Sequence, residues 1–506
     1  MNADDLPRLS AIELRRLIGA RALSPVELLD ACIARIEALN PKVNALCATD
    51  FERARQAAQV AEAQVMKGDP LPPLHGLPLG VKDLQDTAGL LTTYGNVGFR
   101  GHVPASDNGL VARLKRAGAI VTAKTNVPDM GAGANTRNPV WGATGNPFNP
   151  ALNAGGSSGG SAAALALDML PLCTGSDTGG SLRIPAALCG VVGLRPSPGL
   201  VANDARPLGW SVISVLGPMA RTVDETAFML AACTGLDARD PLSYPPTGAA
   251  WPLPEVDPAT LRVGWTEDFG VCPVDPVVRR AFRARVEALR PLCASCEPLE
   301  IDLAEADRVF DILRAESFVA AFADAYRTAP DSLGPNVRAN VEMAASITLA
   351  DRAWAHLEQT RIARRLAQAL ERFDLIVAPV TPVSPFPWTE LYAQAVDGVP
   401  ARNYYHWLGL TYVVTLGTHP ALSLPCGVDE RGMPFGLQLV GRLRGDVALL
   451  GAARALEQAW KGDASLRRPV PDLARLQASN VDLRAIVTHP PLVDGEGAGA
   501  GAAAAV

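Results

Sequence analysis

The chain has 506 residues, of which 48% are hydrophobic and 19% are charged, and its formal net charge is −6 at pH 7. This composition is typical of a globular protein with a large core. A negatively charged chain without clustered Lys and Arg is not suited to phosphate backbones or acidic membranes, so we expect no nucleic-acid partner and no membrane partner. Its nine cysteines are sparse and irregularly spaced, which argues against a disulfide framework.

The length alone would suggest about three domains. No Pro/Ser-rich or charged linker interrupts the chain before about residue 480, however, so we expect residues 1–490 to form one large domain. The first residues are acidic and lack the apolar core of a signal peptide, which predicts a cytoplasmic location. Residues 491–506 are rich in Gly and Ala and should form a disordered tail.

The N-terminal region, residues 8–67, carries clear helix-start signals. Ser10–Glu13 and Ser24–Glu27 both match the capping box, and Pro25 stands at a first helical position, where its missing N–H costs nothing. We expect the second helix to span residues 25–39 and to end at Asn40–Pro41. A third, polar helix should span residues 50–67.

Strands and helices then alternate along the chain. The pattern predicts an apolar strand at Leu77–Val81, then a helix over residues 109–117 and a buried strand over residues 119–123, separated by Gly118. Further strands are expected at residues 261–265, 375–378 and 437–440, and further helices at residues 276–290, 306–327, 349–372 and 446–460. This alternation predicts an α/β architecture whose sheet is covered by helices on both faces.

Two serines stand out because each follows a pair of glycines. Ser157 lies in Gly155–Ser161, and Ser181 lies in Asp177-Thr-Gly-Gly-Ser. Glycine allows a strained backbone whose amides can point at a ligand. The pattern fits an exposed nucleophilic serine with an oxyanion hole beside it.

The base that would activate such a serine is less obvious. None of the six histidines has a metal-binding spacing or is tied to either serine, although a His-based triad stays open at this point. Ser157 and Ser181 lack the Gly-x-Ser-x-Gly elbow, and the glycines lack a P-loop ending. Lys82 is the alternative base, because it follows an apolar strand; a lysine at a strand end is, however, more often simply solvated.

Four motifs together resemble the amidase signature family. They are Val81-Lys82-Asp83, Gly155–Ser161, Asp177–Pro185 and Cys189–Pro196. The resemblance implies an amidase-signature fold with a large mixed, mostly parallel twisted sheet. Its signature core would span about residues 77–220, and a helical region on the substrate side about residues 275–410.

The resemblance also assigns roles to individual residues. It implies a Ser-cisSer-Lys triad in which Ser181 is the nucleophile, Ser157 is a proton bridge on a cis peptide after Gly156, and Lys82 is the base. The oxyanion and substrate would meet Gly131 and the amides of Thr178, Gly179, Gly180 and Ser181. Ser158, Asp177 and Arg183 would support these loops; a plain surface pair is the alternative for Asp177 and Arg183.

The implied function is amide hydrolysis through an acyl-enzyme, extending to aryl amides, esters or carbamates, without a cofactor or metal. The partner would be a small-molecule amide, and the oligomeric state common in the family suggests a homodimer. One alternative is the glutaminase subunit of a tRNA-dependent amidotransferase, and another is a catalytically idle binding protein. The aromatic residues between 404 and 412 would either line the leaving-group side of the pocket or belong to the core: Tyr404, Tyr405, Trp407 and Tyr412.

Overall fold

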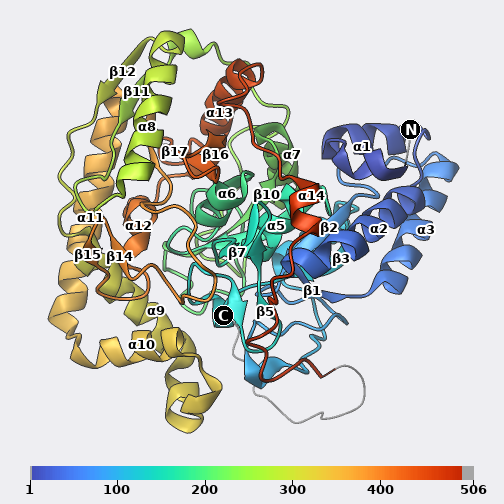
Figure 1. Ribbon diagram of the computed structural model, residues 1–506, viewed down its shortest axis with the longest axis horizontal. Coiled ribbons are helices and arrows are strands. Elements are labelled where there is room, and N and C mark those ends of the chain that lie inside the picture. Colours follow the sequence, from blue (N-terminus) through green and yellow to red (C-terminus); the bar gives the residue numbers. More distant parts are fainter. Residues whose placement is uncertain (1–2, 493–506) are drawn as a thin grey trace.

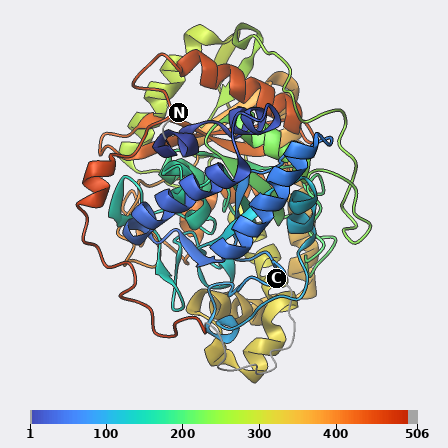
Figure 2. The same cartoon turned by 90° about the vertical axis from the view of Figure 1, so that its right-hand side faces the viewer.

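The computed structural model describes residues 3–492, and its N-terminal region is helical, as the start signals predict. Helices α1 (Ala11–Gly19), α2 (Pro25–Val43) and α3 (Phe51–Lys67) lie on one side of the molecule (Figure 2). The capping box is complete at Ser24. At Ser10 only half of it forms, because the Glu13 carboxylate pairs with Arg16 instead.

The predicted end of α2 at Asn40–Pro41 is wrong, since the helix continues to Val43. Pro41 lies in the last turn and has no N–H to donate to the Glu37 carbonyl, so it costs the helix one backbone hydrogen bond. Val43 is fully buried, and the Asn40 side chain accepts from the backbone N–H groups of Ala45 and Leu46, which secures the turn that follows. Tertiary packing therefore outweighs the helix-stopping tendency of proline.

An eleven-stranded sheet crosses the molecule (Figure 1). From one edge to the other, the neighbouring strands are β1 (Leu46–Thr49), β3 (Ile120–Thr125), β2 (Pro78–Lys82), β8 (Leu172–Asp177), β10 (Val215–Ala220), β9 (Val192–Arg195), β16 (Ala421–Val428), β17 (Pro434–Val440), β13 (Leu375–Pro379), β11 (Arg262–Trp265) and β12 (Ser295–Pro298).

The sheet is mixed, as expected, but it is not mostly parallel. The pairs β3–β2, β2–β8, β13–β11 and β11–β12 are parallel, whereas the other neighbours are antiparallel. One physical reason lies in the middle of the sheet, where β16 and β17 are joined by a short turn that can only make an antiparallel hairpin. The alternation of helices and strands along the chain does not reveal this hairpin, because only its second strand is recognisable from the pattern.

Helices pack on both faces of the sheet, as predicted. Helices α5 (Gly159–Ala166) and α6 (Arg183–Cys189) contact each other and the central strands, and α7 (Val223–Cys233) and α13 (Asp446–Trp460) form a separate contacting pair. Successive side chains of β8 point to opposite faces of the sheet. Leu172 belongs to the hydrophobic cluster that includes residues of α7, and Cys173 belongs to the cluster that includes residues of α5.

The remaining helices lie outside these two pairs: α4 (Gly109–Arg116), α8 (Pro276–Leu289), α9 (Ala306–Thr328), α10 (Pro335–Met343), α11 (Leu349–Arg372), α12 (Gly409–Leu416) and α14 (Leu473–Gln477). Both α11 and α13 have the predicted bounds. Within residues 3–492, no helix is both long and apolar enough to cross a bilayer. The predicted Gly/Ala-rich tail lies outside the described residues, except for Pro491 and Leu492.

Candidate active site

The candidate site forms where two parallel strands end side by side. Lys82 is the last residue of β2, and Ser176 and Asp177 end the neighbouring strand β8. The Lys82 backbone N–H donates to Thr174 Oγ1 at 2.9 Å, which fixes the two strand ends together. Ligands in α/β proteins commonly bind at the carboxyl ends of parallel strands, so this edge is a natural place for chemistry.

The Lys82 side chain is fully buried and is surrounded by hydroxyl groups. Its Nζ lies 2.7 Å from Ser157 Oγ, 2.8 Å from Ser158 Oγ and 2.9 Å from Ser176 Oγ. Burial disfavours the charged amine and lowers the pKa of Lys82 to about 7, although the negative charge of Asp177 opposes this shift. The predicted base is therefore buried, and a large fraction of it is neutral near pH 7.

A neutral amine constrains the hydrogen-bond directions around it. It has two N–H donors and one lone pair, so one of the three neighbouring hydroxyls must donate to Nζ. Ser157 has the shortest contact with Nζ, and of the three it is Ser157 and Ser176 that reach the adjacent cavity. The geometry thus allows a proton to pass between Ser157 and Lys82.

Ser157 lies on the loop before α5, and the Gly156–Ser157 peptide bond is cis. Ser158 links this loop to the loop that carries Ser181, because its backbone N–H donates to the carbonyl oxygen of Ser181 at 3.3 Å. Ser181 stands just before α6 and lines the same cavity as Ser157. The structure therefore brings Lys82, Ser157 and Ser181, which are far apart in the sequence, to one site.

Asp177 and Arg183 form a buried ion pair beneath the Ser181 loop rather than a surface pair. Arg183 Nε and Nη2 donate to the two carboxylate oxygens of Asp177 at 3.0 and 2.9 Å, and both side chains have zero exposure. Arg195 Nη1 donates to the same carboxylate at 3.1 Å. These arginines hold the pKa of the Asp177 carboxyl well below its usual range despite its burial.

One backbone amide of the expected oxyanion set is already engaged. The N–H of Gly180 donates to Asp177 Oδ1 at 2.9 Å, so it braces the loop and is not directed at a substrate oxygen. Gly180 has φ +125°, and a Cβ there would lie 2.3 Å from Thr411 Oγ1, so only glycine fits. The amides of Thr178, Gly179 and Ser181 remain as the candidates.

The serines open onto a cavity of about 140 Å³. Thr178, Gly179 and Gly131 line it. Gly131 has φ +70°, and a Cβ at this position would lie 2.6 Å from Leu84 and 3.7 Å from Ser157 Oγ. A side chain there would crowd the site, whereas glycine leaves that wall open.

The aromatic cluster divides between pocket and core. Tyr404 lines the cavity, but Tyr405, Trp407 and Tyr412 do not, and each of these three is about 1% exposed. The Tyr412 ring stacks on Phe310 with centroids 4.4 Å apart. Of the two expectations for these aromatic residues, Tyr405, Trp407 and Tyr412 therefore belong to the core, whereas Tyr404 lines the pocket.

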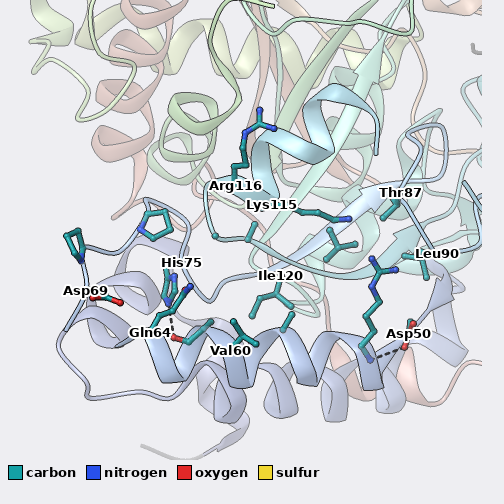
Figure 3. Close-up of a pocket in the computed structure, with 18 residues that line it drawn as sticks. Asp50, Val60, Gln64, Asp69, His75, Thr87, Leu90, Lys115, Arg116 and Ile120 are labelled. Atoms are coloured by element: carbon teal, nitrogen blue, oxygen red, sulfur yellow. Dashed lines mark hydrogen bonds between the residues drawn. The ribbon is translucent and has the colours of Figure 1, made fainter. Parts of the chain in front are cut away.

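A second cavity, of about 670 Å³, lies beside α3, and among residues 3–492 none of the triad residues lines it (Figure 3). Its wall includes His75, whose Nε2 lies 2.9 Å from the carbonyl oxygen of Ala61. Lys115 also lines it, but its ammonium pairs with Asp107 at 2.6 Å. The described residues that line this cavity offer no nucleophile–base pair like that at Lys82.

Sequence reasoning missed three residues of the site: Ser176, Arg195 and Arg314. Ser176 shares a face of its strand with Thr174, but only the structure shows that this face meets Lys82. Arg195 stands at the end of a buried strand, where an arginine needs a partner. Arg314 gives no sequence signal, because only the packing of α9 brings it to the cavity wall.

The Asp177–Arg183 pair leads to a stability prediction. Replacing Arg183 with Met leaves a buried carboxylate with only Arg195, and we expect the free energy of unfolding to fall by about 3 kcal/mol. The exposed Arg280–Glu430 pair provides the control, since Arg280→Met should change it by about 1 kcal/mol or less. Urea denaturation of both variants measures the difference; equal losses would contradict the bracing role.

Comparisons with known proteins show which family the chain belongs to. The family model described as Amidase matches residues 27–450. A curated relative from Roseiflexus castenholzii, a subunit of glutamyl-tRNA(Gln) amidotransferase, is 34% identical over 483 residues, covering 90% of this chain and 96% of that relative.

Solved structures show the same similarity. A bacterial aryl acylamidase of the amidase signature enzymes superposes with a TM-score of 0.82 at 26% identity, covering 89% of this chain and 96% of its own. A further amidase has a TM-score of 0.78 at 31% identity, covering 89% of this chain and all of its own length. The chain therefore belongs to the amidase signature family and is an enzyme that acts on the carbon–nitrogen bonds of amides.

Proposed function

We propose that this enzyme hydrolyses a carboxylic amide to acid and amine through an acyl-enzyme on Ser181. The observation that carries the proposal is the buried contact of 2.7 Å between Lys82 Nζ and Ser157 Oγ, beside a cavity that Ser181 also lines. A lysine whose pKa is about 7 can accept a proton under neutral conditions.

In the first half of the proposed reaction, Ser157 gives its proton to Lys82 and takes one from Ser181. The Ser181 oxygen bonds to the substrate carbonyl carbon, and the carbonyl oxygen becomes an oxyanion held by the amides of Thr178, Gly179 and Ser181. The carbon–nitrogen bond then breaks, and the relay returns the proton to the leaving amine. Water hydrolyses the resulting ester by the same relay, which frees Ser181 and the acid.

The cavity supports a stand-alone hydrolase for small amides, including aryl amides, and the same route would serve esters and carbamates. Its volume is close to the roughly 150 Å³ that accommodates a benzene molecule. No carboxylate side chain in residues 3–492 lines it, so the α-ammonium group of glutamine would have no acidic partner there. A buried unpaired ammonium is strongly disfavoured.

The glutaminase subunit of a tRNA-dependent amidotransferase is the second candidate. Curated relatives from several bacteria are named as glutamyl-tRNA(Gln) amidotransferase subunits, and their sequence identity backs this function more directly than the stand-alone one. A homodimer and a cytoplasmic location stay predictions under either candidate.

Amine and ammonia release from the isolated chain separates the two candidates. The purified protein is offered glutamine, acetanilide and an aliphatic amide at matched concentrations. We expect the aryl or aliphatic amide to have the higher kcat/KM. A clear preference for glutamine would overturn the stand-alone function and favour the amidotransferase function.

A catalytically idle binding protein is tested separately with a serine-directed fluorophosphonate. Because Lys82, Ser157 and Ser181 are all in place, we expect covalent labelling of Ser181. Absence of labelling, under conditions that label a known amidase, would support the idle function.

The pKa of Lys82 gives a pH prediction. The amine is neutral above about pH 7 and protonated below it, so kcat/KM for an uncharged amide should rise with pH and level off above about 7. Below that point we expect about a tenfold loss for each pH unit. Initial rates between pH 5 and 9 measure the profile, and a flat profile from pH 5 to 7 would contradict a lysine base.

A further inference from the structure

One wall of the active-site cavity carries an arginine without an acidic partner. Arg314 projects from α9, lines the cavity, and is only 6% exposed. Within residues 3–492 its guanidinium makes one hydrogen bond, in which Nη2 donates to the Tyr404 hydroxyl, and its buried Nε has no partner. It takes part in none of the ion pairs of the described chain.

A second arginine at the cavity wall has an acidic partner and serves as a comparison for Arg314. Arg206 also lines the wall, but its Nη1 lies 3.2 Å from Asp240, so its charge is balanced within the protein. Arg314 has no such balance, and no carboxylate lines the cavity in the described residues. The cavity therefore carries an uncompensated positive charge.

The surroundings of Arg314 hold its position without neutralising it. Its guanidinium carbon lies 4.6 Å from the Phe318 ring centroid and 5.1 Å from that of Tyr405. Aromatic faces stabilise a cation, but they do not satisfy the N–H groups at its planar edge. Burying a charge without an anion costs free energy, so a bound anion would relieve this cost.

Tyr404 supplies a second donor at the same place. Its hydroxyl oxygen accepts from Arg314 and from Asn340 Nδ2, the latter at 2.7 Å. The Asn340 amide is fixed in this orientation, because Nδ2 also donates to the Asn336 carbonyl at 2.7 Å. With both lone pairs occupied, the Tyr404 O–H proton is left to donate to another group, and Tyr404 lines the cavity.

We propose that Arg314 and Tyr404 bind a carboxylate on the substrate, so that the preferred substrate is an amide that also carries a carboxylate and no ammonium group. This inference rests on the proposed hydrolase function and narrows its substrate class. Guanidinium and phenol donors together suit the oxygens of a carboxylate. Arg314 is then a specificity-determining residue that takes no part in the proton relay.

Matched substrates test the proposal through ammonia and amine release. Glutaramate, whose carboxylate is on the acyl side of the amide bond, is compared with a neutral branched hydrocarbon amide of the same shape. Para-acetamidobenzoate, whose carboxylate is on the amine side, is compared with para-acetamidotoluene. Glutamine adds an ammonium group to glutaramate. We expect the anionic member of at least one pair to have a kcat/KM about 10- to 100-fold higher, and glutamine to be poorer than glutaramate.

Arg314→Gln should remove most of this preference, chiefly by raising KM for the anionic substrate, while the neutral partner changes by about threefold or less. Arg314→Lys, which keeps the charge, should retain part of the preference if Arg314→Gln folds poorly. The control is Arg308→Gln on the same helix, where the side chain is exposed and pairs with Asp351. An unchanged preference in Arg314→Gln, or none in the parent enzyme, would overturn the proposal.

A binding measurement separates this proposal from the hydrolase function. Glutarate should raise the melting temperature of the parent protein and of Arg308→Gln, but not that of Arg314→Gln. If glutarate stabilises the parent in this way while no amide is turned over, the carboxylate site stands and the hydrolase function fails. If amides are turned over without any glutarate effect or anionic preference, the carboxylate site fails and the hydrolase function stands.

Discussion

Ser181→Ala should lower amide turnover by a factor of about 10⁴ or more, because no other group replaces the nucleophile. The melting temperature should stay close to that of the parent, since the Ser181 hydroxyl makes no side-chain hydrogen bond in the described residues. Amide hydrolysis and fluorophosphonate labelling measure the effect, and both should be lost together.

Ser346→Ala is the control for the nucleophile. Ser346 is exposed in the turn between α10 and α11, far along the chain from the serine loops, and its hydroxyl only donates to the Met343 carbonyl. This variant should keep parental turnover and labelling. If Ser181→Ala were still labelled at the parental rate, the reactive serine would be a residue other than Ser181.

Lys82→Met should reduce turnover by about 10³ or more, because it removes the proton acceptor from the relay. Lys82→Arg should be almost as damaging even though it keeps a positive group, since arginine stays protonated and cannot take a proton from Ser157. Steady-state kinetics at pH 8 measure both variants. Substantial activity in Lys82→Arg would show that the residue acts only as a positive charge.

The chain offers a matched control for this lysine. Lys124 is equally buried, and burial lowers its pKa to about 8, but its Nζ donates to the Gln85 carbonyl and to Thr87 Oγ1 rather than to the serines. Lys124→Met should therefore cost stability more than turnover per folded molecule. A loss of turnover as large as that of Lys82→Met would mean that burial alone explains the first result.

Much of the candidate site could be predicted because its residues lie in local motifs. The glycine pairs before Ser157 and Ser181 and the lysine after an apolar strand are visible in the sequence itself. The buried state of Lys82 and its contact with Ser157 follow from the adjacency of β2 and β8 and from the packing of α5 against both strands, which local patterns do not encode.

The wrong predictions for Pro41 and Gly180 and the missed residue Arg314 trace mainly to long-range packing. Pro41 stays helical because Val43 is buried, and the Gly180 amide turns to Asp177 because the carboxylate lies beneath it. Arg314 meets the cavity only through the position of α9. The Gly180 bond itself spans only three residues, but Arg195 of β9 helps to hold the Asp177 carboxylate that accepts it. In the other two cases the deciding contact joins elements that only the completed fold brings together.

The support of the Ser181 loop has a consequence for the newly made protein. Arg183 Nη1 donates to the Thr411 carbonyl at 2.9 Å and to Gln438 Oε1 at 2.7 Å, so the loop is held by residues more than two hundred positions later in the chain. During translation the ribosome releases the three triad residues long before Gln438 emerges. The nascent chain therefore carries every reacting group while lacking the scaffold that orients them, and reactivity should begin only after Gln438 has emerged from the ribosome.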